Sequence, residues 1–485
     1  MGYIAIDLGT TNVKVCCYSA DLSPLSSKGI KVKYDGTGGI VEFNPEDYLK
    51  LVLEALKESI ADSYGGSREK HYITLTGQAE SLVITDKDYN PLANAISWMD
   101  ARSTRETELI EAHFPQKQRY EITGQSYVTE TFPITKMLWL KSHRPELTGS
   151  GIRYLMIKDY IAYRLSGVVK GEYSIYNFTH YLDIRKKDYW GEILDFCGVS
   201  PSNLPELVEP CTELGTIIKE AADEINVSYD SIINCGTLDH FAGMIGTGNI
   251  MKGKVSESTG TVLAIAAIAD SFKTDKGKIP CHYGPFPDSY VYLPVCESGG
   301  ICLEWFRDKF AGNKTFKQLD DEASQREIDE KLIFMPYING VNSPEFDRNA
   351  SGVFYGINIE HDEVSFAAAV MEGVAFLLNK NINALKELDI SPAEIITTGG
   401  GAKSDYWNQL KADITQIPVV IPENPEAALF GAAIIGAVTS GSIADYKQAA
   451  ELIKVKKVFR PRENKVLNKK MELFDSLYEK LFVNI

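Results

Sequence analysis

The stretch YIAIDLGTTNVKVCCYSAD, residues 3 to 21, has two apolar runs on either side of a Gly-Thr-Thr-Asn turn, which predicts a β-hairpin. Gly9 lets a ligand approach the backbone closely, while Thr10, Thr11 and Asn12 add hydroxyl, amide and backbone donors suited to phosphate oxygens. An ordinary hairpin with a polar turn explains this stretch equally well. The hairpin alone therefore leaves phosphate binding open.

Asp7 ends the first apolar run, directly before this turn. A carboxylate in that place would repel a phosphate unless a divalent cation lay between the two groups. The turn and the carboxylate together predict Mg²⁺ at Asp7.

A second, weaker version of the hairpin occurs at KVSESTGTVLAIAAIAD, residues 254 to 270. Two hairpins of one design, half a chain apart, suggest two related domains that face each other across a nucleotide, although so short a similarity could be chance. A chain of 485 residues is also too long for one ordinary core. We place the boundary at GNIMKGK, residues 248 to 254, which predicts domains of residues 1–250 and 251–485.

The segments between the hairpins alternate apolar strands with an amphipathic helix. YITLTG at 72–77 and SLVITD at 81–86 are typical of strands. The segment at 45–65 has Leu49, Leu53, Leu56 and Ile60 at helical spacing, as a core-facing helix requires. Alternation of this kind predicts an α/β fold.

Composition excludes several classes of protein. Fifty basic against 66 acidic residues give a net charge of −16, which opposes nucleic-acid binding, and the basic run at 454–462 is short and interleaved with apolar residues. The longest apolar runs are well short of the roughly 18 residues that span a bilayer. No basic leader precedes the first strand, and the eight cysteines follow no paired spacing. We expect a cytoplasmic protein with reduced thiols and no membrane partner.

A third constellation begins at ITTGGGAKSDYWNQ, from residue 396. Three bare glycines leave space in which adenine or a phosphate could lie against the backbone, although a flexible turn is the better interpretation of GGG alone. Ser404 can cap a helix whose Trp407, Leu410 and Ile414 form one apolar face. Neither a P-loop nor a dinucleotide fingerprint matches this segment.

Asp239 lies in CGTLDHFAG, where a strand over residues 232–238 is followed by a short helix. An ordinary N-cap is one interpretation of this aspartate, and a general base is the other. The helix dipole favours the ionised carboxylate, so the base would be weak. Phosphoryl transfer tolerates a weak base, because its loose transition state needs the attacking hydroxyl positioned more than deprotonated early.

Taken in order, IDLGTT, GQ with WMDAR, GTLDHFAG, SGGICLEWFRD and GGGAKSDYWNQ resemble the FGGY carbohydrate kinases of the actin and hexokinase-like ATPase superfamily. The resemblance covers nearly the whole chain. It implies two ribonuclease H-like domains around a deep cleft. It also implies transfer of the γ-phosphate of ATP to a hydroxyl of a sugar or polyol, with Mg²⁺.

The resemblance also implies roles for single residues. Asp7 is similar to the metal-associated aspartate, and Asp239 to the catalytic base. The implied nucleotide contacts are Thr10, Thr11, Asn12, Lys14, Thr259, Gly260, Gly300, Glu304, Gly401 and Asp405. The implied sugar contacts are Gln78, Ala79, Glu80, Trp98, Asp100 and His240.

Two departures from the family pattern bear on the acceptor. Xylulose kinases commonly read GQMHG where this chain reads GQAES, and glycerol kinases have Arg-Glu at the place of Ala79 and Glu80. A carboxylate there could bridge two sugar hydroxyls, whereas the missing Arg argues against glycerol. The second turn reads STGT where many members read GTSG. We expect a ketose such as xylulose, with polyol and sugar-acid kinases as alternatives.

Three other functions remain possible for such a sequence. A chaperone-like or filament-forming ATPase shares the two turns, a silent sugar sensor would keep the cleft without the base, and a nicotinamide dehydrogenase would need the dinucleotide fingerprint. The expected partners are ATP and a small sugar, and a homodimer is one alternative for the oligomeric state.

Overall fold

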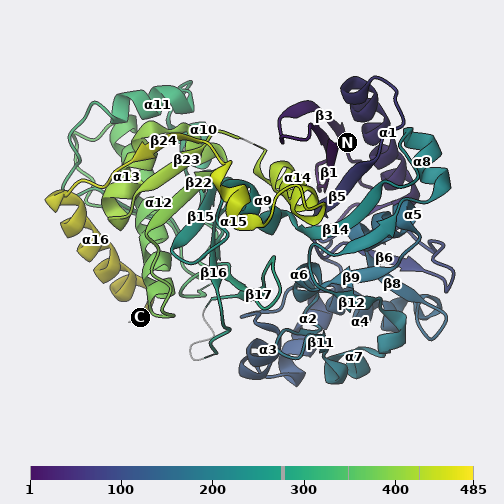
Figure 1. The fold of residues 1–485 in the computed structure, drawn as a ribbon. Helices are drawn as coiled ribbons and strands as arrows, with labels where there is room; N and C mark the ends of the chain where they lie inside the picture. The colour runs from purple at the N-terminus through teal and green to yellow at the C-terminus, as the bar shows by residue number, and fades with distance from the viewer. Residues whose placement is uncertain (1, 275–278, 348, 425, 484–485) are drawn as a thin grey trace.

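The computed structural model describes residues 2–274, 279–347, 349–424 and 426–483, so the outer limits of the two predicted domains, at 1 and 485, lie outside it. The chain forms two lobes, with the N-terminal half in one and most of the C-terminal half in the other (Figure 1). Each lobe is built around one twisted sheet.

The sheet of the first lobe has the strand order β13-β14-β5-β1-β2-β3. β1 (Gly2–Leu8) and β2 (Asn12–Tyr18) form the predicted hairpin, and β3 (Pro24–Lys31) extends it antiparallel. β5 (His71–Gly77) and β14 (Ile232–Leu238) run parallel to β1, and β13 (Glu213–Thr216) closes the edge. The predicted helix is α1 (Pro45–Tyr64), which Asn44 caps and whose apolar face is buried.

The sheet of the second lobe repeats this arrangement. β15 (Lys254–Thr259) pairs antiparallel with β16 (Leu263–Ala269) and parallel with β22 (Glu394–Thr398), which confirms the second hairpin. β18 (Tyr290–Tyr292) and β17 (Cys281–Tyr283) extend one side, and β23 (Val419–Pro422) and β24 (Val455–Phe459) the other. Both sheets therefore have three antiparallel strands followed by two parallel ones, as in the ribonuclease H-like fold.

A smaller substructure is attached to the first lobe. The predicted strand at 81–86 is β6 (Leu82–Thr85), but it belongs to a separate sheet with β4 (Glu42–Phe43), β7 (Ala95–Ile96) and β8 (Arg153–Met156). Four helices cover this region, namely α2 (Thr104–His113), α3 (Gln116–Thr123), α4 (Pro133–His143) and α7 (Gly191–Cys197). By contrast, α5 (Ile157–Ser166) packs into the core of the main sheet, and α6 (Tyr173–Tyr176) contacts β14 and β9 (Lys170–Glu172). Strand propensity was correct here, but it could not reveal which sheet the strand would join.

Two helices join the lobes. α9 (Asp239–Thr247) packs against α14 (Ala427–Thr439), and glycines permit the close approach: a Cβ on Gly246 would lie 2.0 Å from the Ala427 carbonyl oxygen, and one on Gly431 would lie 1.8 Å from that of Ala242. Although α14 comes late in the chain, it shares a buried core with Tyr3 and other residues of the first sheet. The domain division at residue 250 stays a prediction.

An arm of the second lobe also reaches the first. The backbone N–H of Cys281 in β17 donates to the Gly124 carbonyl (2.9 Å), and that of Tyr283 donates to Asn177 Oδ1 (3.0 Å). Figure 1 shows β17 extending between the lobes. The lobes thus meet at α9 and α14 and again at β17.

The second lobe carries three helices that matter for the site. α12 (Glu363–Lys386) is buried along most of its length, because its apolar residues face a sheet and other helices. α10 (Gly300–Phe310) and α13 (Asp405–Thr415) pack near it, and Ser404 caps α13 as predicted, its Oγ accepting from the Trp407 N–H (2.9 Å). Trp407, Leu410 and Ile414 are buried, which confirms the predicted apolar face.

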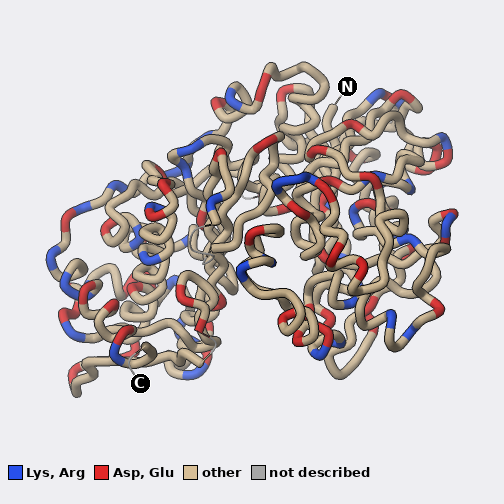
Figure 2. The backbone as a smooth tube through the Cα atoms, turned by 90° about the horizontal axis from the view of Figure 1, so that it is seen from below, with Lys and Arg blue, Asp and Glu red and all other residues tan. Residues whose placement is uncertain are grey.

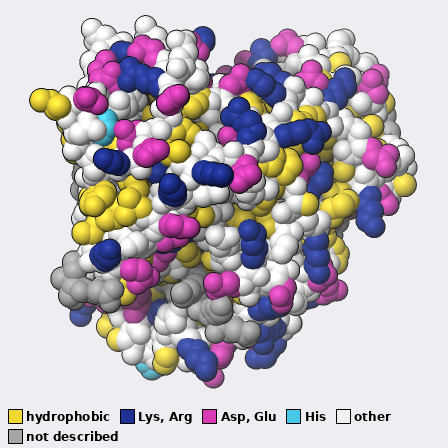
Figure 3. All heavy atoms as spheres, turned by 90° about the vertical axis from the view of Figure 1, so that its left-hand side faces the viewer, with side chains coloured by type: hydrophobic (Ala, Val, Ile, Leu, Met, Phe, Trp, Pro, Cys, Tyr) yellow, Lys and Arg dark blue, Asp and Glu magenta, His cyan; other side chains and the backbone are white. Residues whose placement is uncertain are grey.

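The surface is of mixed charge. Lys and Arg are interspersed with Asp and Glu over both lobes (Figure 2), and the end of the second lobe shows hydrophobic side chains scattered between charged ones (Figure 3). The basic run at 454–462 contains the edge strand β24. No helix within the described ranges is long and apolar enough to span a membrane.

The eight cysteines are all free thiols. Cys16 and Cys17 point to opposite faces of β2 and lie in different cores, as the alternation of a strand requires.

Candidate active site

The first turn lies between β1 and β2 and is held by tyrosines. Gly9 is required because a Cβ there would be 2.5 Å from the Asn12 carbonyl oxygen. The hydroxyl of Tyr48 donates to the Gly9 carbonyl (3.0 Å), and that of Tyr34 donates to the Thr10 carbonyl (2.7 Å). Two carbonyls that would otherwise repel a phosphate are therefore already occupied by donors.

Asp7 lies at the end of β1 with an unsatisfied carboxylate. Its Oδ1 is buried and has no hydrogen-bond partner among the described residues. The pKa of Asp7 is raised to about 7, chiefly by burial and also by the nearby Asp239, against the lowering effect of Lys14, which lies opposite Asp7 in the hairpin. Such a carboxylate fits a divalent cation, which would replace the missing neighbour and offset the repulsion.

Asp239 is the first residue of α9, so its backbone is fixed by the end of β14. The N-cap position belongs to Leu238, and the Asp239 Oδ1 accepts a hydrogen bond from the His240 N–H (2.6 Å). The side chain is half-buried and close enough to Asp7 to affect its titration. The two predicted carboxylates therefore face one region beside the first turn.

The predicted nucleotide residues of the second lobe lie together around one cavity of about 810 Å³. They are Thr259, Gly260, Gly300, Glu304, Gly401 and Asp405. Side chains that the sequence did not single out complete the wall, including Leu303, Phe316, Asp320, Met371 and Tyr406. Apolar and aromatic groups beside a glycine-rich turn give this cavity the character of a nucleoside site.

Two of the predicted nucleotide residues are engaged by other side chains. Lys14 Nζ, on the first lobe, forms an ion pair with Glu426 Oε2 of the second (2.8 Å), and both side chains are exposed. The hydroxyl of Thr259 accepts a hydrogen bond from Lys411 Nζ (2.9 Å) and itself donates to Glu257. A phosphate contact at Thr259 would therefore use its backbone.

The predicted sugar residues lie near the first turn. Trp98 Nε1 donates to the Thr10 hydroxyl (2.8 Å), which links this region directly to the turn. Gln78 is buried, its Oε1 accepts from Ser81 (2.7 Å), and its Nε2 has no partner within the described chain. Ala79 packs against the core.

Glu80 has a left-handed backbone, with φ of +69°. Burial raises the pKa of its carboxyl to about 7, although Lys136 and Thr131 lower it. The two oxygens of this half-buried carboxyl can both act purely as acceptors for sugar hydroxyls only when the group is ionised, because the protonated form carries a donor on one oxygen.

Asp100 and His240 differ in what they can still bind. The Asp100 carboxylate is fully buried, and its oxygens accept from the Val41 N–H (2.6 Å) and from the backbone and guanidinium of Arg102. No acceptor position of the Asp100 carboxylate remains for a ligand, so this carboxylate is placed to hold Val41 and Arg102 in position. His240 is exposed at the start of α9.

Two family models match the chain. The N-terminal domain of the FGGY family of carbohydrate kinases matches residues 2–246, and the C-terminal domain matches residues 259–440. The chain belongs to this family.

Individual relatives support the same assignment. A xylulose kinase of Bacillus subtilis (strain 168) is 32% identical over 99% of this chain and 96% of its own length. The solved structures of a ligand-bound xylulose kinase and of a gluconate kinase, both from Lactobacillus acidophilus, have TM-scores of 0.91 and 25% identity. Each match covers all of this chain, together with 99% of the xylulose kinase chain and 98% of the gluconate kinase chain. This FGGY chain is therefore a carbohydrate kinase, a phosphotransferase with an alcohol group as acceptor.

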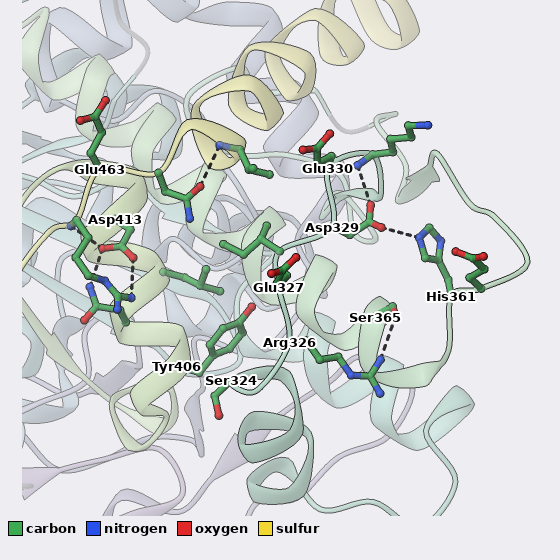
Figure 4. A pocket seen from close by; sticks show the side chains of 18 of the residues that line it. Ser324, Arg326, Glu327, Asp329, Glu330, His361, Ser365, Tyr406, Asp413 and Glu463 are labelled. Carbon is green, nitrogen blue, oxygen red and sulfur yellow. Dashed lines mark hydrogen bonds and ion pairs between the residues drawn. The ribbon is translucent and has the colours of Figure 1, made fainter.

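A second cavity of about 1050 Å³ lies on the same lobe of this FGGY kinase and shares Ser324 and Tyr406 with the first (Figure 4). None of the predicted catalytic, nucleotide or sugar residues lines it. Three of its basic side chains have acidic partners: Arg326 pairs with Asp362 (2.5 Å), Arg462 with Asp413 (3.0 Å), and His361 Nε2 lies 2.9 Å from Asp329 Oδ2.

Sequence reasoning missed residues that surround the two sites of this kinase. Lys136 of α4 is fully buried, its Nζ donates to the Thr131 carbonyl (2.7 Å), and burial lowers its pKa to about 8. The second lobe contributes His282, whose Nδ1 accepts a hydrogen bond from Gln125 Nε2 (3.1 Å). Burial and the nearby His240 lower the pKa of His282 to about 3. A lysine within an apolar helical run was a usable signal for Lys136, whereas nothing local marked His282.

Proposed function

We propose that this FGGY kinase transfers the γ-phosphate of ATP, with Mg²⁺, to a hydroxyl of a small ketose of the xylulose type. The observation that carries the proposal is that Asp7 and Asp239, from distant parts of the chain, face one region beside a turn suited to phosphate. The chain's similarity to xylulose kinases supports the acceptor.

Asp7 would hold the metal. Its buried Oδ1 without a partner and its raised pKa both favour a bound cation, which would be Mg²⁺ because carboxylate and phosphate oxygens are its usual ligands. When bound, Mg²⁺ supplies charge compensation for the triphosphate during transfer.

The nucleotide would lie across both turns. Its adenosine fits the cavity of the second lobe, against the glycines at 400 and 401 and the apolar wall. Backbone donors at the two turns would bind the phosphates, with Thr10, Thr11 and Asn12 on one side and Thr259 and Gly260 on the other. Closure of the lobes around a bound sugar would keep out water, which otherwise competes as acceptor.

Asp239 would act on the sugar hydroxyl. One of its oxygens is held by the His240 N–H, so the other remains for the substrate. It would orient the hydroxyl for in-line attack on the γ-phosphorus and accept its proton as the new bond forms.

Glu80 supports a neutral acceptor. An ionised carboxylate can accept bonds from two hydroxyls of a ketose, whereas it would repel the carboxylate of a sugar acid. A sugar acid such as gluconate is the second candidate, because a gluconate kinase is as similar in structure as the xylulose kinase and because the buried Lys136 lies near Glu80.

The test of the catalytic role is Asp239→Asn, measured with ATP and xylulose, gluconate or glycerol as acceptor. Asn can still accept from the His240 N–H, so the start of α9 should keep its structure. We expect kcat to fall by roughly 10²- to 10⁴-fold while ATP binding changes less than about twofold. Turnover close to that of the unmodified enzyme would refute the base, and phosphorylation of gluconate but not of xylulose would refute the ketose.

A further inference from the structure

A buried ion pair lies beneath the nucleotide cavity of the second lobe. Lys411 Nζ on α13 is 3.0 Å from Glu257 Oε2 on β15, and both side chains are 0% exposed. Taking two charges out of water costs several kcal/mol per ion, which their attraction repays only with further hydrogen bonds. The contacts of this pair therefore indicate which part of the structure depends on it.

Those further bonds all go to elements that form the cavity. Lys411 Nζ also donates to the Thr259 hydroxyl (2.9 Å) and lies 5.3 Å from the ring centre of Trp407. Glu257 accepts from the Thr259 hydroxyl and from that of Thr397 (2.9 Å), on the strand that leads to the three glycines. One pair thus connects the second turn, the glycine turn and the wall formed by α13.

Other buried ion pairs lack this arrangement. Lys470 is paired with Glu372, both nearly fully buried, but neither side chain lines the nucleotide cavity. Lys158 is paired with Glu172 (2.8 Å) in the first lobe. The Lys470–Glu372 pair is a matched control, because it has the same chemistry in the same lobe.

We propose that Lys411 and Glu257 are positioning residues for the nucleotide. They do not touch it. The two side chains hold the hydroxyl of Thr259 away from the phosphates, so that the backbone of the turn contacts the phosphates instead. They also hold the turn at a fixed distance from Trp407. The inference rests on the proposed use of ATP in this cavity, and it predicts that the pair affects nucleotide affinity more than sugar affinity.

The test is the double variant Lys411→Met with Glu257→Gln, which removes both charges at similar volume and leaves no unpaired ion. ATP binding is measured directly without sugar, by titration of a fluorescent ATP analogue, and KM is measured for both substrates. We expect Kd for the nucleotide to rise by roughly tenfold, with KM for the sugar changed less than about twofold. The control, Lys470→Met with Glu372→Gln, should leave nucleotide Kd within about twofold.

Two results would overturn the inference: an unchanged nucleotide Kd in the double variant, or an equal rise in the control. Should the double variant fail to fold, Thr259→Val replaces it, since it removes only the hydroxyl, and Thr259→Ser should restore affinity. An unchanged Kd in Thr259→Val would also overturn the inference. If the unmodified enzyme binds no ATP, the proposed function fails instead, so the two failures are distinguishable.

Discussion

Asp7 is predicted to destabilise the enzyme when no metal is bound. Its pKa rises from 3.8 to about 7 on folding, and each tenfold change in an ionisation constant corresponds to about 1.4 kcal/mol. The cost of ionising Asp7 in the folded protein at pH 8 is therefore at most about 4 kcal/mol. Partial exposure of the residue reduces this cost to about 2 kcal/mol. Asp7→Asn should raise the free energy of unfolding by that amount while abolishing turnover.

The sign of the pH dependence follows from the raised pKa. Below pH ~4 the carboxyl is protonated in both states, and between pH ~4 and ~7 only the folded state keeps the proton, so the unmodified protein loses stability as the pH rises through this range. The advantage of Asp7→Asn should thus be absent near pH 4 and complete at pH 8.

The assay is urea unfolding in EDTA at both pH values, followed by circular dichroism and tryptophan fluorescence. Asp195→Asn, at an exposed position on α7, is the control and should change stability by less than about 0.5 kcal/mol at either pH. An Asp7→Asn protein that is less stable than the unmodified enzyme at pH 8, or equally more stable at pH 4, would refute the reasoning.

Two further predictions concern the lobe contact and the sugar. Gly431→Ala places a Cβ 1.8 Å from the Ala242 carbonyl oxygen and should lower the free energy of unfolding by about 1–3 kcal/mol. Gly243→Ala, on the open face of α9, is the control and should leave the free energy of unfolding unchanged or raise it. Equal thermal denaturation curves for the two variants would contradict this prediction. Because the pKa of Glu80 is about 7, KM for the sugar should fall as the pH rises from 6 to 8, and Glu80→Gln should abolish that dependence; a variant whose KM still follows pH would show that another group is responsible.

The sequence by itself determined the features that depend on neighbouring residues. The two hairpins, the helix over residues 45–65 and the helix cap at Ser404 follow from local propensity and short-range hydrogen bonds, and the structure confirms each of them. The order of the motifs was likewise sufficient to predict the family.

Only the tertiary structure decided which of these segments meet. Strand propensity could not assign β6 to its separate sheet, and helical periodicity could not show that α14 packs on the first lobe. Asp100 matched a sugar-binding motif, but its oxygens are occupied by Arg102 and the Val41 N–H. The sequence signals of Glu257 and Lys411 are those of ordinary charged residues, because a pairing across 154 positions arises only when the packed elements bring the two side chains together.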